Sequence, residues 1–476
     1  MRKRLKRWLH LGHRWLGIAT GLFFAVWFVS GLVMLFVGFP ALTEAERRAA
    51  LPPLALDAVR IGPQEALARA GATAFPAALA LSMSGDEPVY RLVGPDGRRQ
   101  VLSAVTGAPV APLTAETALA LARRHPAARS VADLGTVERD QWTVTARHDP
   151  ARPFRLVALG DPAGTELYLS EATGEIALDT TRAERTWGWV GTVPHWIYFT
   201  PLRAEAALWR QVVLWLSGLC VVAALSGIIL GFLRLRRDRL TPYRGWRAWH
   251  HGAGVVGGLA VVTFIFSGWM SMNPNRWVGP RMPDAAALAR YAGRTAPAFP
   301  LDRAALAGMP PGTVELRFGF LGGEPLVLAA GPEGLRPCCG TAVTPERILA
   351  AARDLVPEAA LAVQHLDAPD AYWSDRHGAP RLPVLRLVFA DEAATWIHVD
   401  PATGEILGRT DRGGRANRWL FAALHTLDVG PLLDHPAARR TVIIGLSLVG
   451  LVVSASGVVL GWRRLRHRGR QPRPAR

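Results

Sequence analysis

The chain carries an internal repeat in which histidines recur at matching positions. A shift of 230 residues superposes Ala-Thr-Gly-Glu-Ile at 172–176 on the same five residues at 402–406. A shift of 237 residues aligns the N-terminal region with the middle of the chain. The aligned pairs include His13 with His250, Gly17 with Gly254, Ser30-Gly31 with Ser267-Gly268, His195 with His425, and Ser226-Gly227 with Ser456-Gly457. This duplication predicts two similar units that contribute equally to one symmetric site.

Four segments contain no Asp, Glu, Lys or Arg and are long enough to cross a bilayer, which takes about 20 helical residues. They are 15–43, 211–233, 248–275 and 441–462. The first is preceded by basic residues, as in a cleaved signal peptide. Its apolar run exceeds the roughly 7–15 residues of a signal peptide core, so we expect a retained transmembrane helix.

The distribution of charge predicts the orientation of these helices. The net charge is +17, but residues 1–14, 234–247 and 463–476 together hold 19 Lys or Arg and only one acid, Asp238. Basic residues confined to short segments beside membrane helices indicate the cytoplasmic side. The same confinement argues against nucleic-acid binding. We therefore expect segments 44–210 and 276–440 on the opposite side, which is the periplasm in a bacterium.

The expected fold class is an α-helical membrane protein, with a four-transmembrane-helix bundle built from two tandem repeats and periplasmic α+β domains. Thr114 and Thr344 are expected to begin helices in the two domains. Alternating residues at 142–145 and 384–389 predict strands. Turns are expected at Thr-Gly pairs, with the glycines at 107, 174 and 404.

The repeated histidines predict two metal-binding pairs, one at each membrane face. His13 and His250 lie at the cytoplasmic ends of the first and third helices, whereas His195 and His425 fall on expected interfacial helices near 187–199 and 415–428. Two facing imidazoles in a helical bundle form an axial pair for haem iron. Gly17 and Gly254 would leave room for a flat porphyrin beside the first pair.

The expected cofactor is haem b, in two non-covalent copies, because the chain lacks the Cys-x-x-Cys-His attachment sequence. His10 and His251 compete with His13 and His250 as ligands, and the repeat alignment favours the latter. A histidine near a membrane interface can also serve only to snorkel or cap a helix. The other histidines of the two domains, including His148, His377 and His398, are expected at the surface or in loops.

Three arginines near the second pair, Arg185, Arg203 and Arg415, are candidates to bind an anionic chelate or haem propionates. Arginines at a membrane surface are also commonly solvated or bound to lipid headgroups. The sequence does not decide between these roles.

Several short motifs resemble those of the PepSY-associated transmembrane family. His-Arg-Trp-Leu-Gly at 13–17 resembles the signature of its first helix. Ser-Gly-Ile-Ile-Leu-Gly at 226–231 and Ser-Gly-Val-Val-Leu-Gly at 456–461 resemble its helix ends. Asp-Pro-Ala-Thr-Gly-Glu-Ile at 400–406 resembles the closing hairpin of the PepSY domain.

This resemblance implies a multi-pass protein of the bacterial inner membrane with a link to iron uptake, and the basic terminal segments described above predict that both termini are cytoplasmic. Some members resemble haem-containing reductases that deliver electrons to periplasmic ferric siderophores. The cytoplasmic segments are too short for a flavin domain, so the electron donor would be a separate flavoprotein or a quinol. The competing interpretation is a non-enzymatic PepSY protein that binds a peptidase or assists assembly of a membrane complex.

Overall fold

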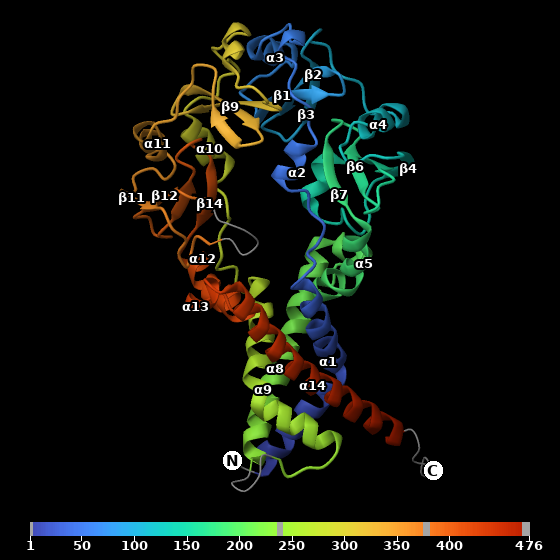
Figure 1. The fold of residues 1–476 in the computed structure, drawn as a ribbon. Coiled ribbons are helices and arrows are strands. Elements are labelled where there is room, and N and C mark those ends of the chain that lie inside the picture. The colour runs from blue at the N-terminus through green and yellow to red at the C-terminus, as the bar shows by residue number, and fades with distance from the viewer. Residues whose placement is uncertain (1–2, 236–240, 375–380, 469–476) are drawn as a thin grey trace. The chain divides into compact units, whose positions relative to one another are not determined.

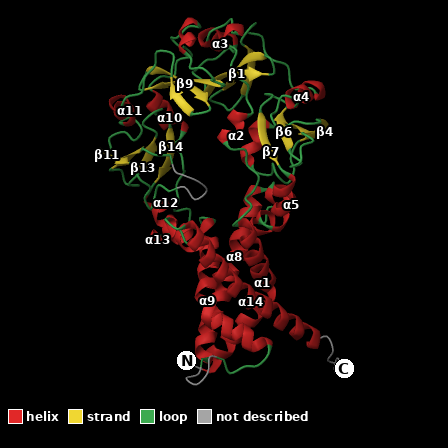
Figure 2. Cartoon of the chain, viewed as in Figure 1, coloured by secondary structure: helices red, strands yellow, loops and turns green. Residues whose placement is uncertain are grey.

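The computed structural model describes residues 3–235, 241–374 and 381–468, which form two compact units. The helical unit comprises residues 1–39, 186–278 and 413–476, and the β unit comprises 40–185 and 279–412. Figures 1 and 2 show the elements of each unit. The expected basic segments 1–14, 234–247 and 463–476, and His377, fall partly or wholly outside the described residues.

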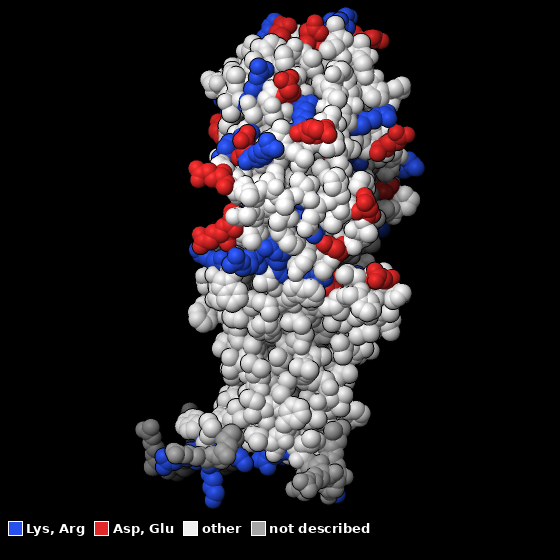
Figure 3. Space-filling model, turned by 90° about the vertical axis from the view of Figure 1, so that its left-hand side faces the viewer, with Lys and Arg blue, Asp and Glu red and all other residues white. Residues whose placement is uncertain are grey.

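Four long helices form the helical unit: α1 (Lys3–Met34), α8 (Ala206–Arg234), α9 (Trp246–Ser271) and α14 (Pro436–Arg468). Within the described residues, these four are long and apolar enough to cross a membrane. Each packs against two neighbours, in the cyclic order α1, α14, α9, α8, so α1 and α9 lie on one diagonal of the bundle. Figure 3 shows a broad zone of this unit without charged side chains on the face drawn.

The helix bounds differ from the charge-free runs of the sequence. α1 begins within the basic stretch, at Lys3, and ends at Met34, before the run ends at Thr43. The chain continues past Gly38 and Pro40 without helical structure, and proline does not support a continuing helix because it lacks an N–H donor. α8, α9 and α14 likewise begin before the first residue of their charge-free runs.

Short helices precede α8 and α14, where the sequence predicts interfacial helices. The first group is α5 (Arg182–Val190), α6 (Thr192–Trp196) and α7 (Thr200–Arg203). The second group is α12 (Arg412–Asn417), a π-helix (Arg418–Ala423) and α13 (Gly430–Leu433). The two groups differ in backbone path, because a break at Gly191 separates α5 from α6 whereas the π-helix follows α12 directly.

The β unit is organised around a six-stranded antiparallel sheet with the strand order β10-β9-β8-β1-β2-β3. Its strands are β1 (Ala78–Ser84), β2 (Glu87–Val93), β3 (Arg99–Ser103), β8 (Glu315–Leu321), β9 (Glu324–Gly331) and β10 (Gly334–Pro337). Strands β1 and β8 pair antiparallel, with Ala80 opposite Arg317. Those two residues are related by the shift of 237, so segments 44–210 and 276–440 share one sheet instead of forming the two separate domains expected. Pairing β1 with β8 satisfies backbone groups that two separate edges would leave open.

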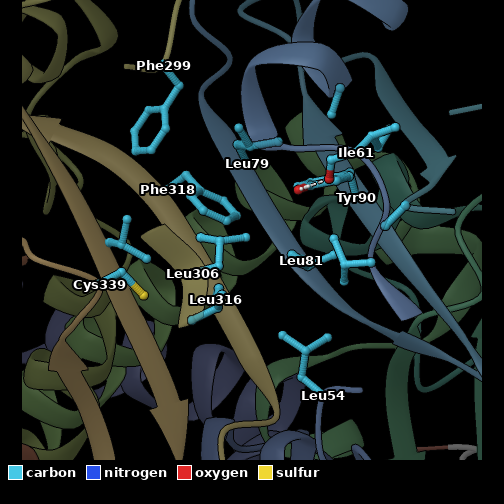
Figure 4. Packing of buried hydrophobic residues seen from close by; sticks show 14 of the residues in the cluster. Leu54, Ile61, Leu79, Leu81, Tyr90, Phe299, Leu306, Leu316, Phe318 and Cys339 are labelled. Carbon is cyan, nitrogen blue, oxygen red and sulfur yellow. Dashed lines mark hydrogen bonds between the residues drawn. The ribbon is translucent and has the colours of Figure 1, made fainter. Parts of the chain in front are cut away.

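The core of this sheet is apolar and closely packed. Leu79 and Leu81 of β1 and Leu316 and Phe318 of β8 are buried together (Figure 4). Tyr90 lies in the same cluster and donates a hydrogen bond of 3.0 Å to the carbonyl oxygen of Ile61. Burial of this cluster stabilises the joined sheet, because apolar surface is removed from water.

Two four-stranded antiparallel sheets complete the unit. Their strands are β4 (Ala132–Val137), β5 (Phe154–Ala158), β6 (Glu166–Ser170) and β7 (Ile176–Thr180) in one, and β11 (Leu361–Leu366), β12 (Val384–Phe389), β13 (Trp396–Val399) and β14 (Ile406–Thr410) in the other. Shorter helices flank the sheets: α2 (Glu44–Ala49), α3 (Pro63–Arg69), α4 (Ala115–Ala122), α10 (Ala285–Ala292) and α11 (Pro345–Ala352). As expected, Thr114 and Thr344 cap α4 and α11 by accepting from a backbone N–H, and Gly107, Gly174 and Gly404 have positive φ.

Two expectations from the sequence are wrong for the β unit. Residues 142–145 are not a strand; they lie in a bend that the Asp140 carboxylate holds by accepting from the N–H groups of Trp142 and Thr143. His148 and His398 are not surface residues, since each side chain lies in a core. Burial first, and then an adjacent arginine (Arg147 and Arg386 respectively), lowers the pKa of both imidazoles to about 4.

Candidate bis-histidine metal sites

The first histidine pair lies across the centre of the helical bundle. His13 projects from α1 and His250 from α9, and their ring centroids are 6.2 Å apart at an interplanar angle of 37°. Because α1 and α9 occupy opposite corners of the four-helix ring, the two imidazoles meet in its interior. We call this the basic-end pair, because it lies near the Lys- and Arg-rich ends of the four helices.

The second pair lies at the opposite end of α1 and α9, from which the chain runs on into the β unit. His195 of α6 and His425, just after the π-helix, have ring centroids 6.1 Å apart at an angle of 65°. α6 packs on α1, and the π-helix packs on α9. We call this the linker-end pair.

Both centroid separations suit two imidazoles that share one metal ion. A metal–nitrogen bond of about 2 Å and a further distance of about 1 Å to the ring centre place two axial rings about 6 Å apart. Directly packed rings in this chain have similar separations, such as 6.2 Å between the centroids of Phe28 and Phe264, so the separation is compatible with a shared metal ion but does not require one. The geometry therefore fits a bis-histidine metal centre at each end of the bundle.

Each of the four histidines has its Nδ1 atom in the same environment. Nδ1 lies against a backbone carbonyl oxygen of a neighbouring long helix and against the hydroxyl of the serine three residues further on. The carbonyl and serine partners are Ala223 and Ser226 for His13, Val453 and Ser456 for His250, Trp27 and Ser30 for His195, and Phe264 and Ser267 for His425. The Nδ1–oxygen distances that describe the serine contacts are 3.0–3.3 Å.

These contacts fix the tautomer of all four rings. Each serine hydroxyl donates its only proton to a carbonyl of its own helix, at 2.8 Å for Ser226, 2.6 Å for Ser456, 2.7 Å for Ser30 and 3.0 Å for Ser267. A carbonyl oxygen can only accept. Nδ1 must therefore carry the N–H in His13, His250 and His425, and the serine contact assigns the same tautomer to His195, which leaves the lone pair on Nε2, where a metal can bind.

A glycine follows each of the four serines and gives the imidazole its space. A Cβ atom added at Gly227 would lie 2.9 Å from Cε1 of His13, and one at Gly457 would lie 3.2 Å from Cε1 of His250. The corresponding distances are 3.2 Å for Gly31 with His195 and 3.6 Å for Gly268 with His425. Each Ser-Gly pair is thus a docking site for an imidazole. The serine oxygen accepts a hydrogen bond from the ring, and the glycine lets the ring approach the helix.

A cavity of about 480 Å³ adjoins the basic-end pair. This volume lies within the range of about 300–1,000 Å³ that is typical of ligand sites. All four long helices contribute glycines to its wall: Gly17, Gly21, Gly227, Gly231, Gly254, Gly258, Gly457 and Gly461. A Cβ atom at Gly17 or Gly254 would meet no other atom within 4 Å among the described residues, so both positions face open space. A flat, wide ligand such as a porphyrin fits this cradle.

The competing histidines are placed differently. His10 contacts the carbonyl of Lys6 through Nδ1 and Arg234 through Nε2, while Nε2 of His251 contacts the carbonyl of Gly231. Neither ring faces the partner ring of a pair in the way that His13 faces His250. Among these four histidines, His13 and His250 form the facing pair, although His10 and His251 also line the cavity.

The three candidate arginines have varied surroundings. Arg185 belongs to the β unit, where it contacts the carbonyls of Thr180 and Gly164 and pairs with Glu166 at 2.9 Å. Arg203 lies over the rings of Tyr198 and Trp209 in the helical unit. Arg415 lies in α12. An ion pair and carbonyl contacts already engage Arg185, which argues against a role in binding an anion.

A buried ion pair beside the linker-end histidines was not predicted. Arg418 is 9% exposed and Asp428 is 1% exposed, and the two side chains approach to 3.5 Å. They bracket His425 in the sequence, and the shift of 230 aligns them with Gly188 and Tyr198, which carry no charge. The repeat pattern could not indicate this pair, because only one copy has it.

The four-helix bundle, the two ring pairs and the β unit define an integral membrane protein with paired imidazole sites. A family model described as the PepSY-associated TM region matches residues 10–314, more than half of the chain. The chain therefore belongs to this family. A comparison with curated proteins finds no match.

Proposed function

We propose that this protein is a haem-dependent membrane reductase that carries electrons from the cytoplasmic side to a ferric siderophore in the bacterial periplasm. Haem b would be held at two places, between His13 and His250 and between His195 and His425. Bound haem supplies one-electron transfer between ferric and ferrous iron. A ferric substrate gains one electron and becomes ferrous, a state that siderophores hold weakly.

The single observation that carries the proposal is the common environment of four imidazoles. A histidine that only caps a helix has no need for a fixed tautomer, a serine acceptor and a glycine at its ring edge. Here the same arrangement occurs four times, in two pairs whose Nε2 lone pairs are free for a metal. Hydrogen bonds from the ring nitrogen that does not bind the metal orient metal-bound histidines and raise their basicity.

The spacing of the two pairs supports transfer across a membrane. Ser30 and Ser267, which hold the linker-end pair, follow His13 and His250 on the same helices by 17 residues each. At 1.5 Å per residue this is about 25 Å along the helix, compared with a hydrocarbon core of about 30 Å. The two sites would thus lie near opposite faces of the bilayer.

The charge distribution supports the direction. The Lys- and Arg-rich ends of the helices favour the cytoplasm, which supports assigning the β unit and the ferric acceptor to the periplasm. The proposal assigns the supply of electrons to a separate flavoprotein or to a membrane quinol.

The test begins with protein purified in detergent from haem-replete cells. Pyridine haemochrome analysis should give about two b-type haems per chain, and the dithionite-reduced protein should reoxidise when a ferric siderophore is added anaerobically, with Fe²⁺ appearing in a ferrous-specific chelator. Colourless, folded protein would contradict the proposal and favour the non-enzymatic PepSY function. Haem-loaded protein that does not reoxidise would retain the haem sites but exclude the siderophore as substrate.

A further inference from the structure

The cavity beside the basic-end pair has two chemically different ends. Phe24 and Val261 line it further along α1 and α9 from the basic end. Towards the basic end its wall contains one arginine from each of the four long helices. They are Arg14 of α1, Arg234 of α8, Arg247 of α9 and Arg464 of α14. The residues that line this cavity include no Asp or Glu. We call these four side chains the arginine rim.

The arginine rim is not neutralised within the part of the chain that the structure describes. None of its members takes part in a described ion pair, and Arg234 instead contacts Nε2 of His10 at 3.3 Å. Arginines of the β unit show the opposite pattern; Arg47, for example, pairs with both Glu44 and Glu315. All four side chains are exposed, so water screens their mutual repulsion, and together they present a cationic surface that favours an anion.

A second observation at the same end is an unsatisfied polar atom. Nδ1 of His251 is buried and has no hydrogen-bond partner among the described residues, although Nε2 of the ring contacts the carbonyl of Gly231 at 3.2 Å. The ring of Tyr243 packs edge-on against His251, with centroids 5.3 Å apart, and also lines the cavity. Because Nε2 faces a carbonyl and so carries the N–H, this Nδ1 is an acceptor, and it marks a position for a hydrogen-bond donor such as an ordered water.

We propose that the arginine rim binds the two side-chain carboxylates of the haem, so that the porphyrin sits with its carboxylate edge towards the basic end and its apolar edge against Phe24 and Val261. This inference rests on the proposed haem site and adds the orientation of its ligand. The same oxyanion chemistry is offered by the phosphate of an anionic lipid. The cavity favours the haem carboxylates, because the arginine rim, apolar side chains and both His13 and His250 line the same cavity.

The experiment compares haem b with its dimethyl ester, in which both carboxylates are blocked. Full-length protein is produced under haem limitation and titrated with each porphyrin, in wild type and in the Arg14→Gln and Arg247→Gln variants. Arg466→Gln is the matched control, because its guanidinium lies 5.1 Å from the centroid of the Trp462 ring and the residue does not line the cavity.

We expect the ester to bind one of the two sites at least tenfold more weakly than haem b, since a charge-assisted hydrogen bond contributes about that factor. Each rim variant should weaken haem b about tenfold at that site and leave the ester unchanged, while Arg466→Gln should bind like wild type. Equal weakening of both porphyrins, or of neither, would overturn the inference. A loss of rim-variant effects after removal of lipid, restored by adding an anionic lipid, would assign the rim to lipid.

Circular dichroism of each variant before titration separates loss of fold from loss of binding. A redox titration of the haem-loaded variants gives a second measurement, in which removal of a rim cation should shift one midpoint potential to a more negative value. If neither porphyrin binds wild type at any site, the proposed function itself fails. If haem b and the ester bind equally well, only the role of the rim fails.

Discussion

The histidines of the basic-end and linker-end pairs contact the same kind of Ser-Gly pair, but they lie on different types of secondary structure. His13 and His250 stand within long regular helices, whereas His195 lies on the short helix α6 and His425 follows a π-helix. All four rings nevertheless dock on a Ser-Gly pair of α1, α8, α9 or α14. The bundle therefore fixes the position and tautomer of each imidazole, while the secondary structure of the segment that carries the imidazole can differ.

The two pairs also differ in their surroundings. The basic-end pair adjoins a glycine-walled cavity with an arginine rim. The linker-end pair is accompanied by the buried Arg418–Asp428 ion pair and by contacts of His425 with the rings of Phe264 and Phe421. Changes at one end are therefore expected to affect one haem and leave the other in place.

The largest expected effect on haem content comes from filling the glycine-lined cavity. Gly17→Leu or Gly254→Leu places a side chain in open space, so the helices should stay folded, because leucine also favours helix by about 0.5–1 kcal/mol over glycine. The side chain would occupy the porphyrin position, and we expect a loss of about one haem of two, measured by pyridine haemochrome.

Gly12→Leu is the matched control, because Gly12 lies on the same helix as Gly17, is exposed and does not line the cavity. Retention of both haems in Gly17→Leu and Gly254→Leu would show that the cavity is not a porphyrin site.

Removal of one partner of the buried ion pair should act at the other end. Asp428→Asn leaves the Arg418 cation buried without its counter-charge, which typically costs about 3–5 kcal/mol. We expect a lower midpoint of thermal unfolding and weaker haem retention at the linker-end pair only. Asp434→Asn, at an exposed residue without a described ion pair, serves as the control. Loss of haem at the basic-end pair alone would contradict the assignment.

Substitution of the serines should change potentials more than occupancy. Ser226→Ala or Ser456→Ala removes one acceptor from the Nδ1–H of a basic-end histidine, and Ser30→Ala or Ser267→Ala does so at the linker end. A less basic imidazole stabilises ferric iron less, so one midpoint potential should rise, by up to about 40 mV if the lost hydrogen bond contributes about 1 kcal/mol.

Redox titration followed by absorbance measures this shift. Ser217→Ala is the control, because its hydroxyl is buried on the same helix as Ser226, does not line the cavity and bonds only carbonyls of its own helix. An equal shift in the control would mean that the serines act through helix stability.

The smallest difference needs no substitution. The ring planes meet at 37° in the basic-end pair and at 65° in the linker-end pair. Nearly perpendicular axial imidazoles leave two iron d orbitals close in energy, which makes the low-spin ferric signal more anisotropic. Electron paramagnetic resonance should therefore show two unequal signals, with the more anisotropic one lost in His195→Ala. A single common signal would contradict the difference in geometry.

Much of the helical unit was accessible from the sequence. Charge-free runs predicted the four long helices, since the bilayer imposes length and composition on any spanning segment. The repeat selected His13, His250, His195 and His425 among thirteen histidines, and the structure brings them together in two pairs. That they bind haem stays a prediction.

The rest depended on contacts between distant segments. The four Ser-Gly pairs were visible as repeated motifs, but their role follows only once each serine is seen beside an imidazole. The pairing of β1 with β8, the burial of His148 and His398, and the Arg418–Asp428 ion pair each join residues that no local periodicity relates. At 142–145, the Asp140 side chain bonds the backbone and so overrides the alternation that predicted a strand.

The haem content of paired histidine variants is the decisive measurement. Haem per chain should be about two in wild type, about one in the His13→Ala/His250→Ala and in the His195→Ala/His425→Ala variants, and zero when all four histidines are replaced. The lost haem should be a different one in each double variant, as judged by its potential and resonance signal. A wild type without haem, or a fourfold variant that keeps both haems, would contradict the assignment of these histidines as ligands.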